Sequence, residues 1–159
     1  MKREVPTVAL AAAIIVSLAA GCGDDDDGGE AGGGEVNVVL SEWVVEPDPA
    51  SVDAGEITFV ADNQGGEIHE LVVVEAASAD ELPLGDEDSF DEEAFGEENV
   101  LGEVEDVAAG ETKELTLVLE AGSYVLLCNI VEEMGEMEME PGTSLSHFVN
   151  GMHATFTVE

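Results

Sequence analysis

The last fourteen residues of the chain, SHFVNGMHATFTVE at positions 146–159, end in an alternating pattern that is typical of a β-strand. Successive side chains of a strand point to opposite faces, so Met152 and Phe156 would share an apolar face and His153 would lie on the polar one. We therefore expect Met152 to face a core and His153 to face solvent. The stretch also places a second imidazole, His147, just before this strand.

The same period of two recurs from Glu35 onward, in short runs separated by turns rich in Gly and Asp. The sets that share a parity are Val36, Val38 and Leu40; Ile57, Phe59 and Ala61; His69, Leu71 and Val73; Leu115, Leu117 and Leu119; and Tyr124, Leu126 and Cys128. The sequence has no βαβ alternation and no internal repeat. These features predict an all-β domain over residues 35–159, folded as a two-sheet, Greek-key antiparallel β-sandwich. We expect its one tryptophan, Trp43, and its one tyrosine, Tyr124, to lie in the core.

Two acidic stretches interrupt the strands, and we expect both to be loops at the ends of the sandwich. Residues 78–106 hold 13 acidic residues, with one short helix expected in DEEAFGEEN at positions 91–99. Residues 132–146, EEMGEMEMEPGTSLS, form the second stretch. Its three methionines, Met134, Met137 and Met139, have a spacing that can bind Cu(I), although a solvated acidic loop is the interpretation we favour.

The N-terminus predicts export. Lys2 and Arg3 precede an apolar run over residues 8–20, which is shorter than the roughly 20 residues that span a bilayer. The following LAAGC resembles the lipobox of bacterial lipoproteins, which implies a signal peptide at 1–21 and a lipid on Cys22. The acidic, Gly-rich residues 22–34 would then be a tether. An ordinary signal peptide with an incidental cysteine is the alternative. The lipoprotein prediction places the domain on the outer face of the cell membrane.

The net charge of −35 limits the partners of the protein. Removal of residues 1–21 would leave 37 acidic residues against one base, Lys113. Repulsion excludes nucleic acid and anionic membrane surfaces as partners. The acidity is explained either by a salty medium or by attraction to a basic docking partner. The near-total loss of Lys and Arg favours the salty medium, because docking needs only one acidic patch.

Four side chains carry the candidate chemistry: His69, Cys128, His147 and Met152. With Cys22 lipidated, Cys128 would be a lone thiol in an oxidising compartment, where an unpaired thiol is expected to be buried or bound. A thiolate, two imidazoles and a weak thioether form the ligand set of a type 1 copper site. Each residue alone is more typical of a core position. Their joint presence in a chain with three histidines favours a metal site.

Three stretches resemble the cupredoxins, the family of plastocyanin and azurin: AGEITFVADNQGGEIHELVVV at 54–74, AGETKELTLVLEAGSYVLLCNI at 109–130 and SHFVNGMHATFTV at 146–158. The resemblance implies that His69 and His147 are imidazole ligands, Cys128 the thiolate and Met152 the axial thioether of one copper. One feature departs from the family, because 18 residues separate Cys128 from His147 where a few are usual. An insertion can loop outward without moving its ends, since loop-closure entropy grows slowly with length.

The sequence thus predicts a membrane-anchored electron-transfer protein that is not an enzyme. Neither a nucleophile elbow nor a phosphate-binding glycine loop is present. Electrons would pass through an exposed edge of His147 to redox partner proteins. Two alternatives stay open: a copper scavenger or chaperone that uses the Met-rich loop, and a metal-free interaction module.

Overall fold

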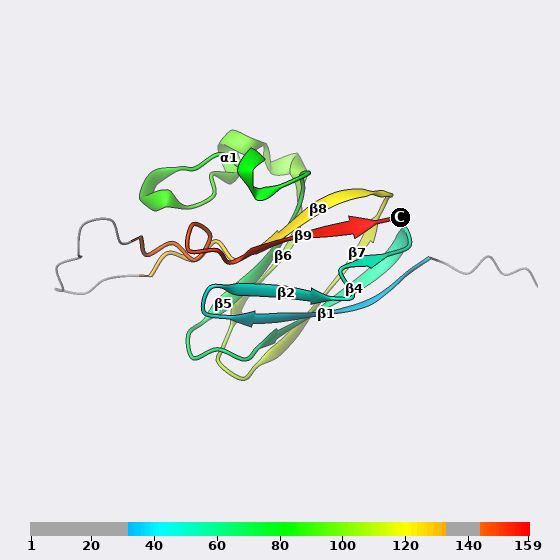
Figure 1. Ribbon diagram of the computed structural model, residues 1–159, viewed down its shortest axis with the longest axis horizontal. Coiled ribbons are helices and arrows are strands. Elements are labelled where there is room, and N and C mark those ends of the chain that lie inside the picture. Colours follow the sequence, from blue (N-terminus) through cyan, green and yellow to red (C-terminus); the bar gives the residue numbers. More distant parts are fainter. Residues whose placement is uncertain (1–31, 133–143) are drawn as a thin grey trace, which may run out of the picture. The chain divides into compact units, whose positions relative to one another are not determined.

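The computed structural model describes residues 32–132 and 144–159 (Figure 1). The described residues all belong to one compact unit, Ala31–Glu159. The predicted signal peptide, Cys22, and the methionines at 134, 137 and 139 lie outside the described residues. Among the helices that are described, none is long and apolar enough to cross a membrane.

Two sheets pack face to face in this unit. The first has the strand order β2 (Val44–Asp48), β1 (Gly33–Ser41), β4 (Gly55–Asn63) and β7 (Thr112–Leu119). The second has the order β3 (Ser51–Val52), β9 (His153–Val158), β8 (Gly122–Leu127), β5 (His69–Glu75) and β6 (Val100–Val107). The predicted β-sandwich is confirmed, with β1 beginning at Gly33, inside the expected tether.

The sheets are mixed, whereas the sequence predicted antiparallel pairing. β1 pairs with β4 in parallel, and so does β3 with β9, while the other ladders are antiparallel. An alternating pattern fixes which face of a strand is buried and carries no information on the direction of its neighbour. The direction depends on connections that cross from one sheet to the other.

The main core lies between the sheets and follows the predicted parity. Val36, Val38 and Leu40 of β1 are fully buried, as are the predicted positions of β4. Phe59 and Phe156 meet edge to face across the core, with ring centroids 5.3 Å apart. Tyr124 is buried as predicted, and its hydroxyl donates to the carbonyl of Glu120.

A second core covers the opposite face of β5 and β8, which a one-sided alternation did not predict. Its buried members are Val72, Val74, Ala76, Leu82, Phe90, Val125, Leu127 and Phe148. Residues 76–99, here called the acidic lobe, supply the cover (Figure 1). The lobe contains α1 (Glu92–Phe95) and the short 3-10 turns η1 (Ala79–Glu81), η2 (Asp86–Asp88) and η3 (Glu97–Asn99). The predicted helix is therefore present, within a packed segment that contributes its own core residues.

Residues 100–107 form β6 and correct the prediction of a continuous loop over 78–106. β6 is the edge strand beside β5, and only Val107 in it is buried. Three acids, Glu103, Glu105 and Asp106, hid the strand pattern in the sequence. An edge strand tolerates such charges, which also oppose pairing with another chain.

Candidate metal centre

The strand order brings the four predicted residues to one end of the sandwich. β5 begins at His69 and runs antiparallel to β8, which ends directly before Cys128. The backbone N–H of Cys128 donates to the carbonyl of Met152 at 3.0 Å, and the N–H of Met152 donates to the carbonyl of His147 at 3.0 Å. Positions far apart in sequence are thus joined through neighbouring strand ends.

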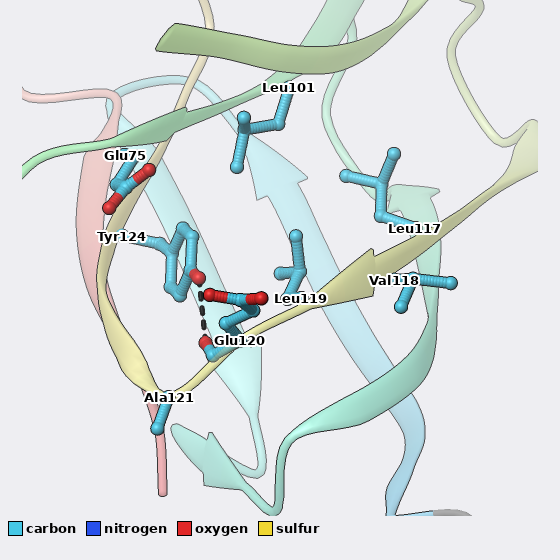
Figure 2. A pocket seen from close by; sticks show the side chains of 8 residues that line it. All are labelled: Glu75, Leu101, Leu117, Val118, Leu119, Glu120, Ala121 and Tyr124. Carbon is cyan, nitrogen blue, oxygen red and sulfur yellow. Dashed lines mark hydrogen bonds between the residues drawn. The ribbon is translucent and has the colours of Figure 1, made fainter.

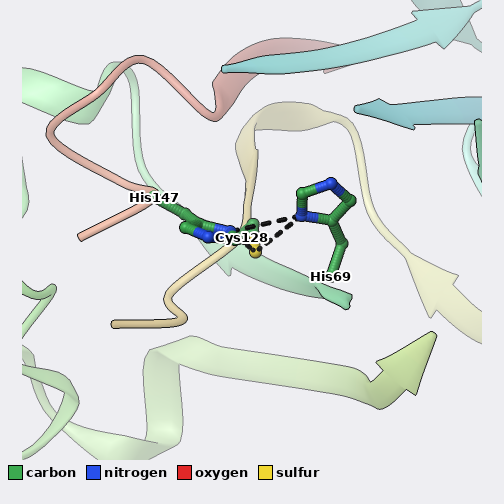
Figure 3. A group of neighbouring side chains, drawn as sticks. All are labelled: His69, Cys128 and His147. Carbon is green, nitrogen blue, oxygen red and sulfur yellow. Dashed lines mark hydrogen bonds between the residues drawn. The ribbon is translucent and has the colours of Figure 1, made fainter. Parts of the chain in front are cut away.

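Three donor atoms point toward one another (Figure 3). The Nδ1 atoms of His69 and His147 lie 3.2 Å apart. The Sγ atom of Cys128 lies 3.3 Å from Nδ1 of His147 and 4.0 Å from Nδ1 of His69. Metal–nitrogen and metal–sulfur bonds of about 2.0–2.3 Å place three donors around one ion roughly 3–4 Å from one another. The cluster therefore has the size of a metal site.

The three residues of the cluster are buried, and the protonation states of Cys128 and His69 are those expected of a metal site without its metal. His69, Cys128 and His147 are all buried, and Nε2 of His69 has no hydrogen-bond partner among the described residues. Burial raises the pKa of the Cys128 thiol to about 12, an effect that backbone hydrogen bonds from Glu70 and Ile130 only partly offset. Burial also lowers the pKa of His69, and the neighbouring His147 lowers it further. A neutral imidazole and a thiol that needs a cation to ionise are features of an apo metal site.

Met152 is fully buried in the main core together with Cys128. Its backbone is hydrogen-bonded to Cys128 on one side and to His147 on the other, which places Met152 next to both residues at this end of the sandwich. His153 is exposed, as the strand parity predicted, and it lies outside the buried cluster.

The insertion between Cys128 and His147 is closed at its base by backbone pairing. We call residues 129–146 the ligand-loop insertion. The N–H of His147 donates to the carbonyl of Ile130 at 2.8 Å, and the N–H of Glu132 donates to that of Leu145 at 3.0 Å. Val131 and Ser146 form the bridge between them. These contacts hold the two described ends of the insertion together next to the cluster.

The acidic lobe supports the same loop from the side of the second core. The side-chain amide of Asn129 donates to the carbonyl of Phe90, and its side-chain oxygen accepts from the N–H of Phe90. The ring of Phe148, next to His147, lies 6.2 Å from that of Phe90. The neighbours of both Cys128 and His147 are therefore fixed by the lobe.

His147 is covered, which corrects the predicted exposed edge. The residue is only 2% exposed, and its Nε2 lies 3.0 Å from Oε1 of Glu132. Trp43 packs edge to face on the imidazole, with ring centroids 5.7 Å apart. Trp43 is itself 48% exposed, so its prediction as a core aromatic was wrong. It stands in the turn between β1 and β2 with a φ of 65°, a left-handed conformation that is uncommon for a bulky side chain.

A hollow at the opposite end of β8 is separate from the cluster (Figure 2). Leucine side chains from β6 and β7 line it beside Tyr124, and its acidic groups are Glu75 and Glu120. It contains no residue that binds soft metals.

Two residues of the site were missed in the sequence. Glu132 is one of many acids in its stretch, and nothing in the sequence distinguishes it. Asn129 directly follows Cys128, and a polar residue beside a predicted ligand was the available signal.

Comparisons with known proteins agree with this architecture. No family model matches the chain, and no curated protein matches it. Among solved structures, the dithionite-reduced auracyanin of the photosynthetic bacterium Roseiflexus castenholzii aligns with a TM-score of 0.51 and 18% identity, over 80% of this chain and 96% of its own. Auracyanin B aligns with a TM-score of 0.51 and 21% identity, over 79% and 88%. The chain has the cupredoxin fold. Within this cupredoxin fold, the His-Cys-His cluster lies at the ends of β5 and β8.

Proposed function

We propose that this cupredoxin-fold protein is a one-electron carrier that holds a single type 1 copper. The observation that supports it best is the buried cluster of His69, Cys128 and His147, whose donor atoms lie within 4.8 Å of one another. Met152 would be the axial thioether. A thiolate and two imidazoles accept both copper oxidation states, and a long axial thioether is the usual fourth partner.

Copper would supply the redox couple, and the protein residues would hold its ligands still. Cys128 and Met152 are tied by the backbone hydrogen bond between adjacent strand ends. Asn129, the residue after Cys128, is hydrogen-bonded to Phe90 of the lobe. Its backbone N–H also donates to the carboxylate of Glu70 at 2.9 Å. A site so constrained on several sides changes little between oxidation states, which favours fast electron transfer.

We propose that electrons cross the surface at Trp43 instead of at His147 directly. Trp43 contacts the His147 ring and is half exposed. Ile68 and Val149, which lie one and two residues from the histidines, are also exposed large apolar side chains. Partners would be redox proteins that meet this apolar face, with a basic rim facing the acidic surroundings. Trp43→Ala should slow reduction by a basic c-type cytochrome in stopped-flow experiments without changing the copper spectrum; an unchanged rate would reject this route.

The location of the protein is part of the proposal. An exported lipoprotein with a lipid on Cys22 would keep the domain near membrane redox partners at high effective concentration. Its role there would be electron transfer without catalysis. Mass spectrometry of the chain from membranes tests the anchor, because a mature chain without a lipid on Cys22 would exclude it.

The deciding experiment is the visible spectrum of the fragment 28–159 after one equivalent of Cu(II). An intense thiolate-to-copper band is expected, lost in Cys128→Ser and in His147→Ala. His153→Ala is the matched control and should keep the band. Met152→Leu should keep copper and shift its potential. A colourless fragment with a freely reactive Cys128 would overturn the proposal.

A further inference from the structure

Glu132 places a carboxylate against the outer nitrogen of a buried histidine. Its Oε1 lies 3.0 Å from Nε2 of His147, while the Glu132 side chain is 41% exposed. The backbone of Glu132 is fixed by the hydrogen bond of its N–H to the carbonyl of Leu145. The contact thus links Glu132, whose backbone is held at the base of the ligand-loop insertion, to His147, one of the two imidazoles of the cluster.

This contact determines which nitrogen of His147 is free. Nδ1 faces Sγ of Cys128 and Nδ1 of His69, inside the cluster. A carboxylate only accepts hydrogen bonds when ionised, so Nε2 of His147 must carry the proton that it donates. Nδ1 is then left as a lone pair directed at the cluster. A carboxylate that accepts from the outer N–H of a metal-binding histidine fixes its tautomer and makes it a stronger ligand.

The other histidine lacks such a partner. Nε2 of His69 is buried and makes no hydrogen bond to any described residue. The two imidazoles of the cluster therefore differ: among the described residues, a carboxylate contacts the outer nitrogen of His147 and none contacts that of His69.

We propose that Glu132 is a positioning residue that orients His147 for the metal and stabilises the oxidised, more positively charged copper. The inference rests on the proposed copper site, and it assigns a role to the ligand-loop insertion that separates this chain from short-loop cupredoxins. The negative charge beside the ligand favours Cu(II) over Cu(I), so Glu132 lowers the reduction potential.

The first test uses the metal-free full chain, solubilised in mild detergent at pH 8, and needs no copper. Nitrogen-15 NMR of the imidazoles reports the tautomer of His147. The native chain should show protonated Nε2, Glu132→Ala should populate protonated Nδ1, and Glu132→Gln, whose amide oxygen still accepts, should resemble the native chain. An unchanged tautomer in Glu132→Ala would overturn the proposal.

The second test loads the same variants with copper and measures affinity and potential. Loss of an outer-shell partner typically costs 10–100-fold in metal affinity, and we expect Glu132→Ala to fall in this range. Both Glu132 variants should raise the potential. The matched control is Glu67→Gln, which removes an exposed carboxylate two residues from His69. Equal potentials in Glu132→Gln and Glu67→Gln would reject the stabilising role of the charge.

The two tests separate this inference from the proposed function. A native chain that binds no copper yet shows the Glu132-dependent tautomer would refute the electron carrier and retain the positioning contact. A blue native protein whose Glu132→Ala variant keeps tautomer, affinity and potential would retain the carrier and refute the role of Glu132.

Discussion

Two acidic segments depart from a minimal sandwich, and they attach to it in different ways. The acidic lobe contributes Leu82 and Phe90 to a second core and covers the outer face of β5 and β8. The described ends of the ligand-loop insertion attach through the Val131–Ser146 bridge, with its two backbone hydrogen bonds, and through the polar contacts of Asn129. Both segments contact the surroundings of the metal cluster: Phe90 of the lobe meets Asn129 and Phe148, and Glu132 of the insertion meets His147.

The difference shows how one site accommodates two insertions. Apolar burial makes the lobe part of the fold, because it removes a sheet face from water. The insertion needs only a closed base, because the cost of a longer loop grows slowly with its length. The lobe should therefore dominate stability, while the insertion should act on the chemistry of His147.

The largest expected effect is that of Phe90→Ala in the lobe. The ring is 3% exposed and packs on Phe95 and Phe148, so its loss should reduce the free energy of unfolding by about 3–5 kcal/mol. Denaturant titration of the metal-free fragment 28–159 measures this. The control is Leu84→Ala in the same lobe, which is 53% exposed and should cost less than about 0.5 kcal/mol. Equal losses would mean that the lobe is a loosely attached loop.

Cys128 precedes Asn129, which joins the insertion to the lobe. Its thiol should make copper binding steeply dependent on pH. Burial holds the thiol pKa at about 12, so the metal-free protein keeps this proton throughout the neutral range. Cu(II) binding must release it, and the apparent affinity should rise about tenfold per pH unit between pH 7.5 and 9. Chelator competition measures the slope. A flat profile would show that the thiolate is not a ligand.

Glu70, beside the contact of Asn129 with the lobe, should make stability fall as pH rises. Burial raises its pKa from 4.5 to about 7, and the nearby Glu103 adds to the shift. Because the folded pKa exceeds the unfolded one, the protonated form is favoured by folding, and this contribution is lost between about pH 4.5 and 7. Glu70→Gln should therefore gain about 1–3 kcal/mol at pH 8 and little at pH 4.5. Thermal unfolding of the metal-free fragment tests this, with Glu67→Gln as the exposed control. A gain independent of pH would contradict it.

The smallest effect is expected from shortening the ligand-loop insertion. Replacing residues 133–143 with four Gly and Ser residues keeps the paired base and Glu132. The free energy of unfolding should change by less than about 1 kcal/mol, because loop-closure entropy depends only weakly on loop length. The copper spectrum should also stay the same. A bleached site would place part of the metal chemistry in the replaced residues.

The sequence predicted features that depend on local pattern. Alternation identified the inward positions of β1, β4 and β9, and the order of the candidate ligands predicted that His69, Cys128 and His147 meet at one end of the sandwich. Val72 and Val74 escaped the prediction because their cover comes from a distant acidic segment. β6 escaped because its charges suit an edge strand and mask the alternation. Trp43 was misplaced because a large aromatic is usually buried, whereas this one caps a turn over His147.

What the sequence determined by itself was the sandwich and the four candidate ligands, since strand period and donor chemistry are properties of residue types. Tertiary structure alone decided the direction of the strands, the second core and the covered edge of His147. It also selected Glu132 among 38 acidic residues. The physical reason is that a hydrogen bond forms only when two groups are about 3 Å apart. The Glu132–His147 contact of 3.0 Å depends on the pairing of residues 130–132 with 145–147, and no local sequence pattern encodes that pairing.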